Sequence, residues 1–141
     1  MRAEEVTDAV RKHLHASADH EAFARRVLSR AADEDLGWAL VAVFYAALHA
    51  VRAYFATHGA EVSSHEEGES QFRKRPEISR SFVKYKALKE MSEGYRYFHD
   101  VIPREQVVAA LASLGSIRSM VDGQTRRRCP DAFAPDPPKA P

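Results

Sequence analysis

The stretch LGWALVAVFYAAL, from Leu36 to Leu48, decides the fold class of this 141-residue chain. It is the longest apolar run in the sequence, and its 13 residues fall short of the roughly 18 to 20 that a membrane-spanning helix needs. Acidic residues at 33–35 suit the positive end of a helix dipole, and Gly59 suits the position after a helix end. We therefore predict a helix over residues 33–57. Because it is apolar nearly all round, it needs neighbours on several sides or a second subunit.

The composition limits the number of domains, the kinds of partner and the cysteine chemistry that this chain can have. With 45% hydrophobic and 29% charged residues, the chain suits one globular domain. Lys and Arg number 21 and Asp and Glu 20, so a polyanion or a membrane would have to be attracted by a local patch. Cys129 is the only cysteine, which excludes an intramolecular disulfide and a metal site built on several thiolates. Charged residues are scattered through positions 1–20, so we expect no secretory signal, no membrane partner and a cytoplasmic protein.

The rest of the sequence also favours helices, because apolar residues recur every three or four positions and hairpin turn pairs are missing. We predict an all-α protein, an up-and-down bundle of four main helices. The predicted segments are an N-terminal arm at 1–32, a bundle at 33–123 and a disordered Pro-rich tail at 124–141. The arm consists of two amphipathic helices, and Asp19 is the predicted cap of the second. Within the bundle, Ser63 or Ser64 caps a short helix over 65–74, a long helix covers 77–98, and Pro103 starts a last helix that Gly123 closes.

The order of these features resembles the HEPN family of small helical bundles. The residues that carry the resemblance are Phe44 to Ala53 (FYAALHAVRA), Gly59, Ser64 to Gly68 (SHEEG) with Phe72, and then Tyr85, Leu88, Ser92, Arg96 and Tyr97. The resemblance covers roughly residues 35–121. It implies a homodimer, an association with RNA, and a protein partner such as an antitoxin in a stress, defence or toxin–antitoxin context.

Active HEPN proteins are metal-independent ribonucleases whose site contains an Arg, four to six intervening residues, and a His. The resemblance implies Arg96 and His99 as the catalytic pair, in which His moves a proton and Arg holds the scissile phosphate. Only two residues separate them here, however. Arg52 and His58 have five intervening residues, but an offset of six rotates them by about 240° on a helix, so they do not share a face.

The broken spacing favours a non-catalytic or weakly active member that binds RNA or a protein partner. The alternatives are an active metal-independent ribonuclease, and a structural homodimeric interaction module or a small-molecule-binding bundle. Arg96 itself lies four residues after Ser92, on the apolar stripe of its predicted helix. It can therefore be satisfied by an acidic partner or by carbonyl groups at a bundle or dimer seam, or it can contact a phosphate.

Two further sets of residues are candidates for function. Residues 72–89 carry seven cations and one acid, a net charge of +6, and the predicted RNA-binding residues are Arg73, Lys74, Arg75, Arg80, Lys84, Lys86 and Lys89. Phe72, Phe82 and Tyr85 lie among them, either as stacking rings for RNA or as core residues below a solvated face. Tyr45, His49 and Arg52 form a polar line on the central helix, either a satisfied core network or part of a ligand site. The seven histidines show no His-Glu-x-x-His pair, so we expect no metal and no cofactor.

Overall fold

A computed structural model describes residues 2–30, 33–60, 62, 64–98 and 101–135. In these residues every regular element is a helix, which confirms the all-α prediction. The elements are α1 (Ala3–Arg30), a 3-10 turn η1 (Asp33–Asp35), α2 (Leu36–Ala56), α3 (His65–Lys74), a 3-10 turn η2 (Ser79–Ser81), α4 (Phe82–Phe98), α5 (Arg104–Arg128) and a 3-10 turn η3 (Pro130–Phe133).

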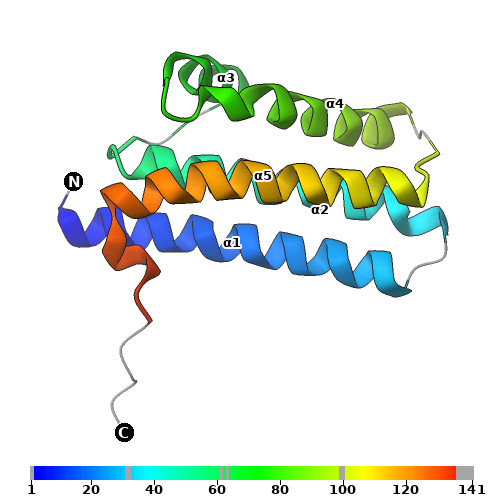
Figure 1. The fold of residues 1–141 in the computed structure, drawn as a ribbon, viewed down its shortest axis with the longest axis horizontal. Coiled ribbons are helices and arrows are strands. Elements are labelled where there is room, and N and C mark those ends of the chain that lie inside the picture. Colours follow the sequence, from blue (N-terminus) through cyan, green and yellow to red (C-terminus); the bar gives the residue numbers. More distant parts are fainter. Residues whose placement is uncertain (1, 31–32, 61, 63, 99–100, 136–141) are drawn as a thin grey trace, which may run out of the picture.

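Helix α2 is the central element of the fold. The helices α1, α4 and α5 each make most of their helix contacts with α2 rather than with one another. Figure 1 shows the four long helices side by side, with consecutive ones running in opposite directions and with α3 next to the start of α4. The arrangement follows from the sequence of α2, which is apolar on every side and is covered by three neighbours.

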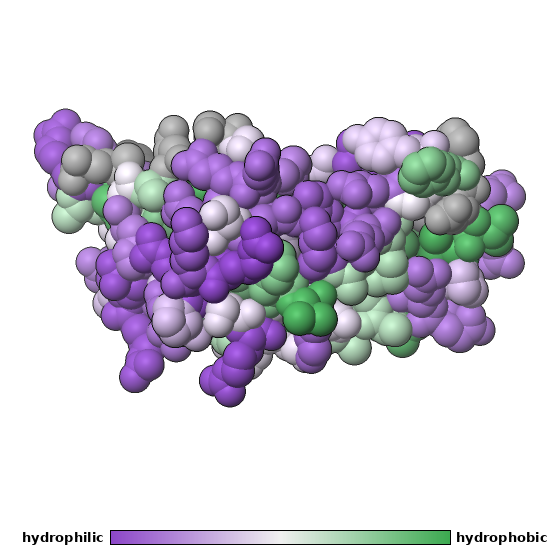
Figure 2. Space-filling view, turned by 90° about the horizontal axis from the view of Figure 1, so that it is seen from above, coloured by the Kyte–Doolittle hydropathy of each residue, from purple (hydrophilic) through white to green (hydrophobic). Residues whose placement is uncertain are grey.

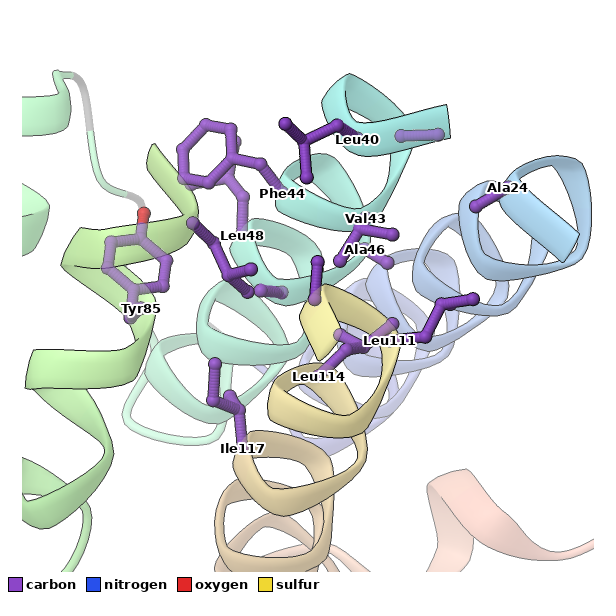
Figure 3. Close-up of a cluster of buried hydrophobic side chains, with 14 of the residues drawn as sticks. Ala24, Leu40, Val43, Phe44, Ala46, Leu48, Tyr85, Leu111, Leu114 and Ile117 are labelled. Atoms are coloured by element: carbon purple, nitrogen blue, oxygen red, sulfur yellow. The ribbon is translucent and has the colours of Figure 1, made fainter. Parts of the chain in front are cut away.

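The packing around α2 depends on its small residues. Ala39, Ala46, Ala50 and Ala53 are fully buried, and their short side chains let the neighbouring helices approach the α2 backbone. Larger side chains fill the space between helices, among them Phe44, Leu48, Leu114 and Ile117 in Figure 3. One segment, Asp33–Ala56, is long and apolar enough to cross a membrane, but 83% of its apolar window is buried inside the protein. This burial is what the core helix of a soluble protein shows, as predicted for this stretch.

The N-terminal segment differs from the prediction of two helices. Residues 3–30 form one continuous helix that packs along α2 and is part of the bundle. Asp19 does not cap a second helix, because it lies inside α1, where neither Pro nor Gly interrupts the chain. The two predicted amphipathic patterns are therefore two parts of one buried stripe, which includes Val10, Leu14 and Ala24.

The predicted boundary of the tail at residue 124 is also wrong. Helix α5 continues through Gly123 to Arg128, because Thr125 is buried and its hydroxyl donates to the Val121 carbonyl at 3.0 Å. Cys129 and Ala132 then pack with Val10 and Leu14 in a second, smaller apolar cluster. The final residues of the predicted tail, 136–141, lie outside the described residues.

In the segment between α2 and α4, the residues that end and start the helices lie where the sequence predicted them. Gly59 has a φ of 71°, a left-handed conformation that glycine adopts at low cost just after a helix. Ser64 is the cap of α3, and its side-chain oxygen accepts from the Glu67 N–H at 3.1 Å. Ser63, the other predicted cap, lies outside the described residues. This loop and cap hold α3 next to α4 and position the cationic segment.

Candidate functional site

The first candidate site surrounds Arg96 on α4. Its Nη1 donates to the Tyr45 hydroxyl at 3.3 Å and its Nη2 donates to the Tyr97 hydroxyl at 3.2 Å. The guanidinium carbon lies 5.9 Å from the Tyr45 ring centroid and 5.1 Å from the Tyr97 centroid, within the range of cation–π attraction. Over residues 2–30, 33–60, 62, 64–98 and 101–135, Arg96 forms no ion pair. The partners of this arginine are tyrosines, not the carboxylate or carbonyl groups that the sequence suggested.

Further aromatic residues lie next to Arg96 in sequence on α4, and one of them, Tyr95, contacts Trp38 on α2. The Trp38 ring meets the Tyr95 ring edge-on, with centroids 5.4 Å apart. The backbone of Gly37 makes this contact possible, since a Cβ atom there would lie 1.9 Å from the Tyr95 ring. Trp38 is 53% exposed, Tyr97 63% and Phe98 77%, so all three side chains reach the solvent. We call Trp38, Tyr45, Tyr95, Arg96, Tyr97 and Phe98 the aromatic–arginine cluster.

Two residues of the polar line on α2, Tyr45 and His49, contact histidines on α1 and so connect the cluster to that helix. His49 Nδ1 lies 3.0 Å from His13 Nδ1, and the His49 ring lies 5.5 Å from the His20 ring. His20 in turn lies 5.7 Å from the Tyr45 ring. A hydrogen bond between two imidazole nitrogens needs one donor and one acceptor. Only one of the two facing Nδ1 atoms can therefore carry a hydrogen. We call His13, His20 and His49 the histidine row.

Burial and neighbouring charges both disfavour protonation of His49. Burial lowers the pKa of His49 to about 4, and the charges of His13, His20 and Arg52 add to this effect. His49 is therefore neutral near pH 7. The sequence predicts that His49 lies on the same helix face as Tyr45. His13 and His20 were not predicted as site residues, although their spacing of seven residues puts them on one face of a helix. Their contact with His49 depends on α1 lying along α2, which no local pattern specifies.

The remaining predicted site residues are only partly brought together. His58 contacts Arg75, with a closest nitrogen separation of 3.3 Å, and its ring meets Tyr54. Arg52 instead lines a cavity between α2, α3 and α4, so the structure does not join it to His58. His99 lies outside the described residues, and its pairing with Arg96 stays a prediction.

The cationic segment is less open than its sequence suggested. Lys86 and Lys89 both bind Glu69, at 2.8 and 3.2 Å, and Arg73 lies over the Phe82 ring. Phe72 and Tyr85 are 1% and 4% exposed, so these two rings belong to the core and cannot stack on RNA. Four cations of the segment are exposed and form no ion pair in the described part of the chain: Arg73, Lys74, Arg80 and Lys84. In the same part of the chain, no group of three or more His, Cys, Asp or Glu residues is placed to hold a metal ion.

The fold and these clusters define an all-helical bundle with an exposed aromatic–arginine cluster and an adjoining histidine row. Comparison with known proteins gives no match among family models, curated proteins or solved structures. The function is therefore argued from the chemistry of the site.

Proposed function

We propose that this protein binds single-stranded RNA through the aromatic–arginine cluster, as a non-catalytic or weakly active HEPN-like protein of the cytoplasm. The observation that carries the proposal is Arg96, which has no ion-pair partner in the described part of the chain and contacts two tyrosine rings, of which that of Tyr97 is exposed. The stress, defence or toxin–antitoxin context rests on the HEPN resemblance alone.

The chemistry of the cluster matches what a single strand offers. Two tyrosine hydroxyls accept from Arg96, which leaves other guanidinium N–H groups for phosphate oxygens. Each base has an aromatic face, and stacking on a protein ring contributes about 1–3 kcal/mol per base. Trp38, Tyr97 and Phe98 are exposed aromatic residues, of which Tyr97 contacts the cation and Phe98 follows Tyr97 on α4. A strand could therefore place a phosphate on Arg96 and neighbouring bases on these rings.

Removal of the Arg96 charge is expected to weaken RNA binding about tenfold at low salt, because a charge-assisted phosphate contact is lost. Trp38 is the only tryptophan, so stacking can be followed by its fluorescence during titration with a short single-stranded oligonucleotide. The variant Arg96→Gln is compared with Arg26→Gln, which removes an equal charge from an exposed position on α1.

The outcomes separate the proposed role from its alternatives. Salt-dependent quenching that Arg96→Gln weakens and Arg26→Gln leaves intact supports the proposal. Absence of binding by the wild-type protein at low salt contradicts it. If labelled RNA is cut in EDTA by the wild type and not by Arg96→Gln, the site belongs to a metal-independent ribonuclease instead.

A homodimeric interaction module is the second candidate function, and one observation favours it. Phe98 and Val101 are 77% and 94% exposed, and Figure 2 shows hydrophobic side chains gathered toward the end of the molecule on the right of that view. Exposed aromatic and apolar groups of this kind are enriched at protein interfaces. Sedimentation measures the oligomeric state of the wild type and of Phe98→Asp. If the protein is a homodimer built on this end, the wild type sediments as a dimer and the variant dissociates.

A further inference from the structure

A cationic surface lies toward the end of the bundle opposite the aromatic–arginine cluster. Two shallow hollows meet there at Glu77, and cations line both of them. Arg80, before α4, and Arg127, near the end of α5, line the first hollow, and Lys74 and Arg75 line the second. In Figure 1 the end of α5 lies at the same end of the bundle as α3 and the start of α4. We call Lys74, Arg75, Arg80 and Arg127 the cationic end.

Packing at the C-terminal end of α2 brings these cations together from distant parts of the sequence. The Arg128 Nε donates to the Thr57 hydroxyl at 3.0 Å, and Arg75 contacts His58. The charges of Arg75 and Arg128 add to the effect of burial in lowering the pKa of His58. The predicted cationic segment and the arginines that end α5 therefore belong to one surface.

The charge of this surface is only partly balanced. Four cations and one carboxylate line the two hollows, a net charge of +3. The carboxylate is that of Glu77, which accepts a hydrogen bond from the Tyr54 hydroxyl. None of the four cations forms an ion pair with a residue that the structure describes. Their charges are thus available to an anionic partner, and a guanidinium can bind phosphate through two parallel N–H groups.

The cationic end offers charge without an apolar anchor. None of the exposed large hydrophobic side chains in the described part of the chain lines either hollow. Protein interfaces depend on buried aromatic and aliphatic anchors, whereas a nucleic-acid backbone is held largely by charge. The floor of the first hollow includes the short residues Ser116, Ser119 and Gly123 of α5, so a strand can approach the helix closely. A row of phosphates therefore fits this surface better than an acidic protein does.

We propose that the cationic end binds the phosphate backbone of RNA, without reading its bases, where the strand extends beyond the aromatic–arginine cluster. This inference rests on the proposed function, because one strand contacts both sites. Arg80 and Arg96 lie about 24 Å apart along the axis of α4, at 1.5 Å per residue. At about 3.4 Å per stacked nucleotide, about seven nucleotides cover that distance. A strand of four nucleotides reaches one site at a time, and a strand of twelve reaches both.

The test compares uridine oligonucleotides of four and twelve nucleotides, with binding followed by Trp38 fluorescence at several salt concentrations. The longer strand is expected to bind more tightly and with a steeper salt dependence. Arg80→Gln and Arg127→Gln are each expected to lower the slope of log K against log salt for the longer strand by about 0.7, because one phosphate contact is lost. Neither variant changes quenching by the shorter strand. Arg26→Gln is the matched control, because it removes an equal charge from an exposed position on α1.

A variant with the opposite sign guards against effects of misfolding. Glu77→Gln removes the carboxylate between the two hollows and keeps an oxygen that accepts from Tyr54, so it is expected to strengthen binding of the longer strand about threefold. A damaged protein would not bind more tightly.

The outcomes separate this inference from the proposed function. If the shorter strand quenches Trp38 but the longer one has the same salt slope, or keeps its slope in Arg80→Gln and Arg127→Gln, the cationic end does not bind RNA and the cluster stands alone. If neither strand quenches Trp38, the proposed function fails and this inference fails with it. Poly-glutamate that removes the advantage of the longer strand as effectively as unlabelled RNA would assign the surface to acidic chains in general and overturn the assignment to RNA.

Discussion

Gly37→Ala is expected to destabilise the protein by up to about 2 kcal/mol. The new Cβ atom would lie 1.9 Å from the Tyr95 ring, so the ring must leave the α2 backbone. Overpacking of this kind costs about 1 to 3 kcal/mol, and the better helix propensity of alanine offsets about 1 kcal/mol. Denaturant unfolding followed by circular dichroism measures the net effect. Trp38 fluorescence is expected to change at the same time, because Tyr95 is its ring contact.

A double-variant comparison isolates the clash. With Tyr95→Ala already present, the three ring atoms nearest to the added Cβ atom are gone, and Gly37→Ala is then expected to stabilise α2 by about 1 kcal/mol through helix propensity. Gly115→Ala serves as the control, because nothing lies within 4 Å of a Cβ atom at that position on α5. If Gly37→Ala is equally stabilising with and without Tyr95, the close packing of α4 on α2 is not as described.

The sequence was sufficient to predict the helices whose ends carry local signals. The serine before His65 caps α3 through a hydrogen bond three residues away, Gly59 acts through its own backbone conformation, and the acidic residues before Leu36 lie at the positive end of the α2 dipole. Asp19 and Gly123 gave wrong boundaries, because both residues lie in helices held by long-range packing. Thr125 and Cys129 are buried by partners far away in sequence, and that burial extends α5 past a glycine.

The candidate site was less predictable than the fold, for the same reason. Arg96 was recognised as unusual because a charge falls on an apolar stripe, but its contacts with Tyr45 depend on how α4 crosses α2. Lys86 and Lys89 read as free cations in sequence, whereas Glu69 on α3 binds both. Periodicity gives the face on which a residue lies, and only the packing of helices gives its partner.

Acidification from pH 7 to pH 4 is expected to destabilise the protein through the histidine row. In the unfolded chain His49 binds a proton with its ordinary pKa of 6.5, whereas in the folded protein burial lowers this pKa to about 4. The unfolded state therefore binds more protons as the pH falls below 6.5, and stability present above that pH is lost toward pH 4. Since the row is partly exposed, we expect a loss of about 1 to 3 kcal/mol.

His49→Gln is expected to flatten this pH dependence, because glutamine keeps a hydrogen-bonding group beside His13 and cannot be protonated in this range. The measurement is the free energy of unfolding in urea at a series of pH values. His15→Gln provides the control, since His15 is exposed on the same helix as His13 and His20. A pH profile that His15→Gln changes as much as His49→Gln would show that general charge repulsion, and not the histidine row, governs acid unfolding. Such a result would mean that the contact of the histidine row between α1 and α2 does not cause the pH dependence of stability.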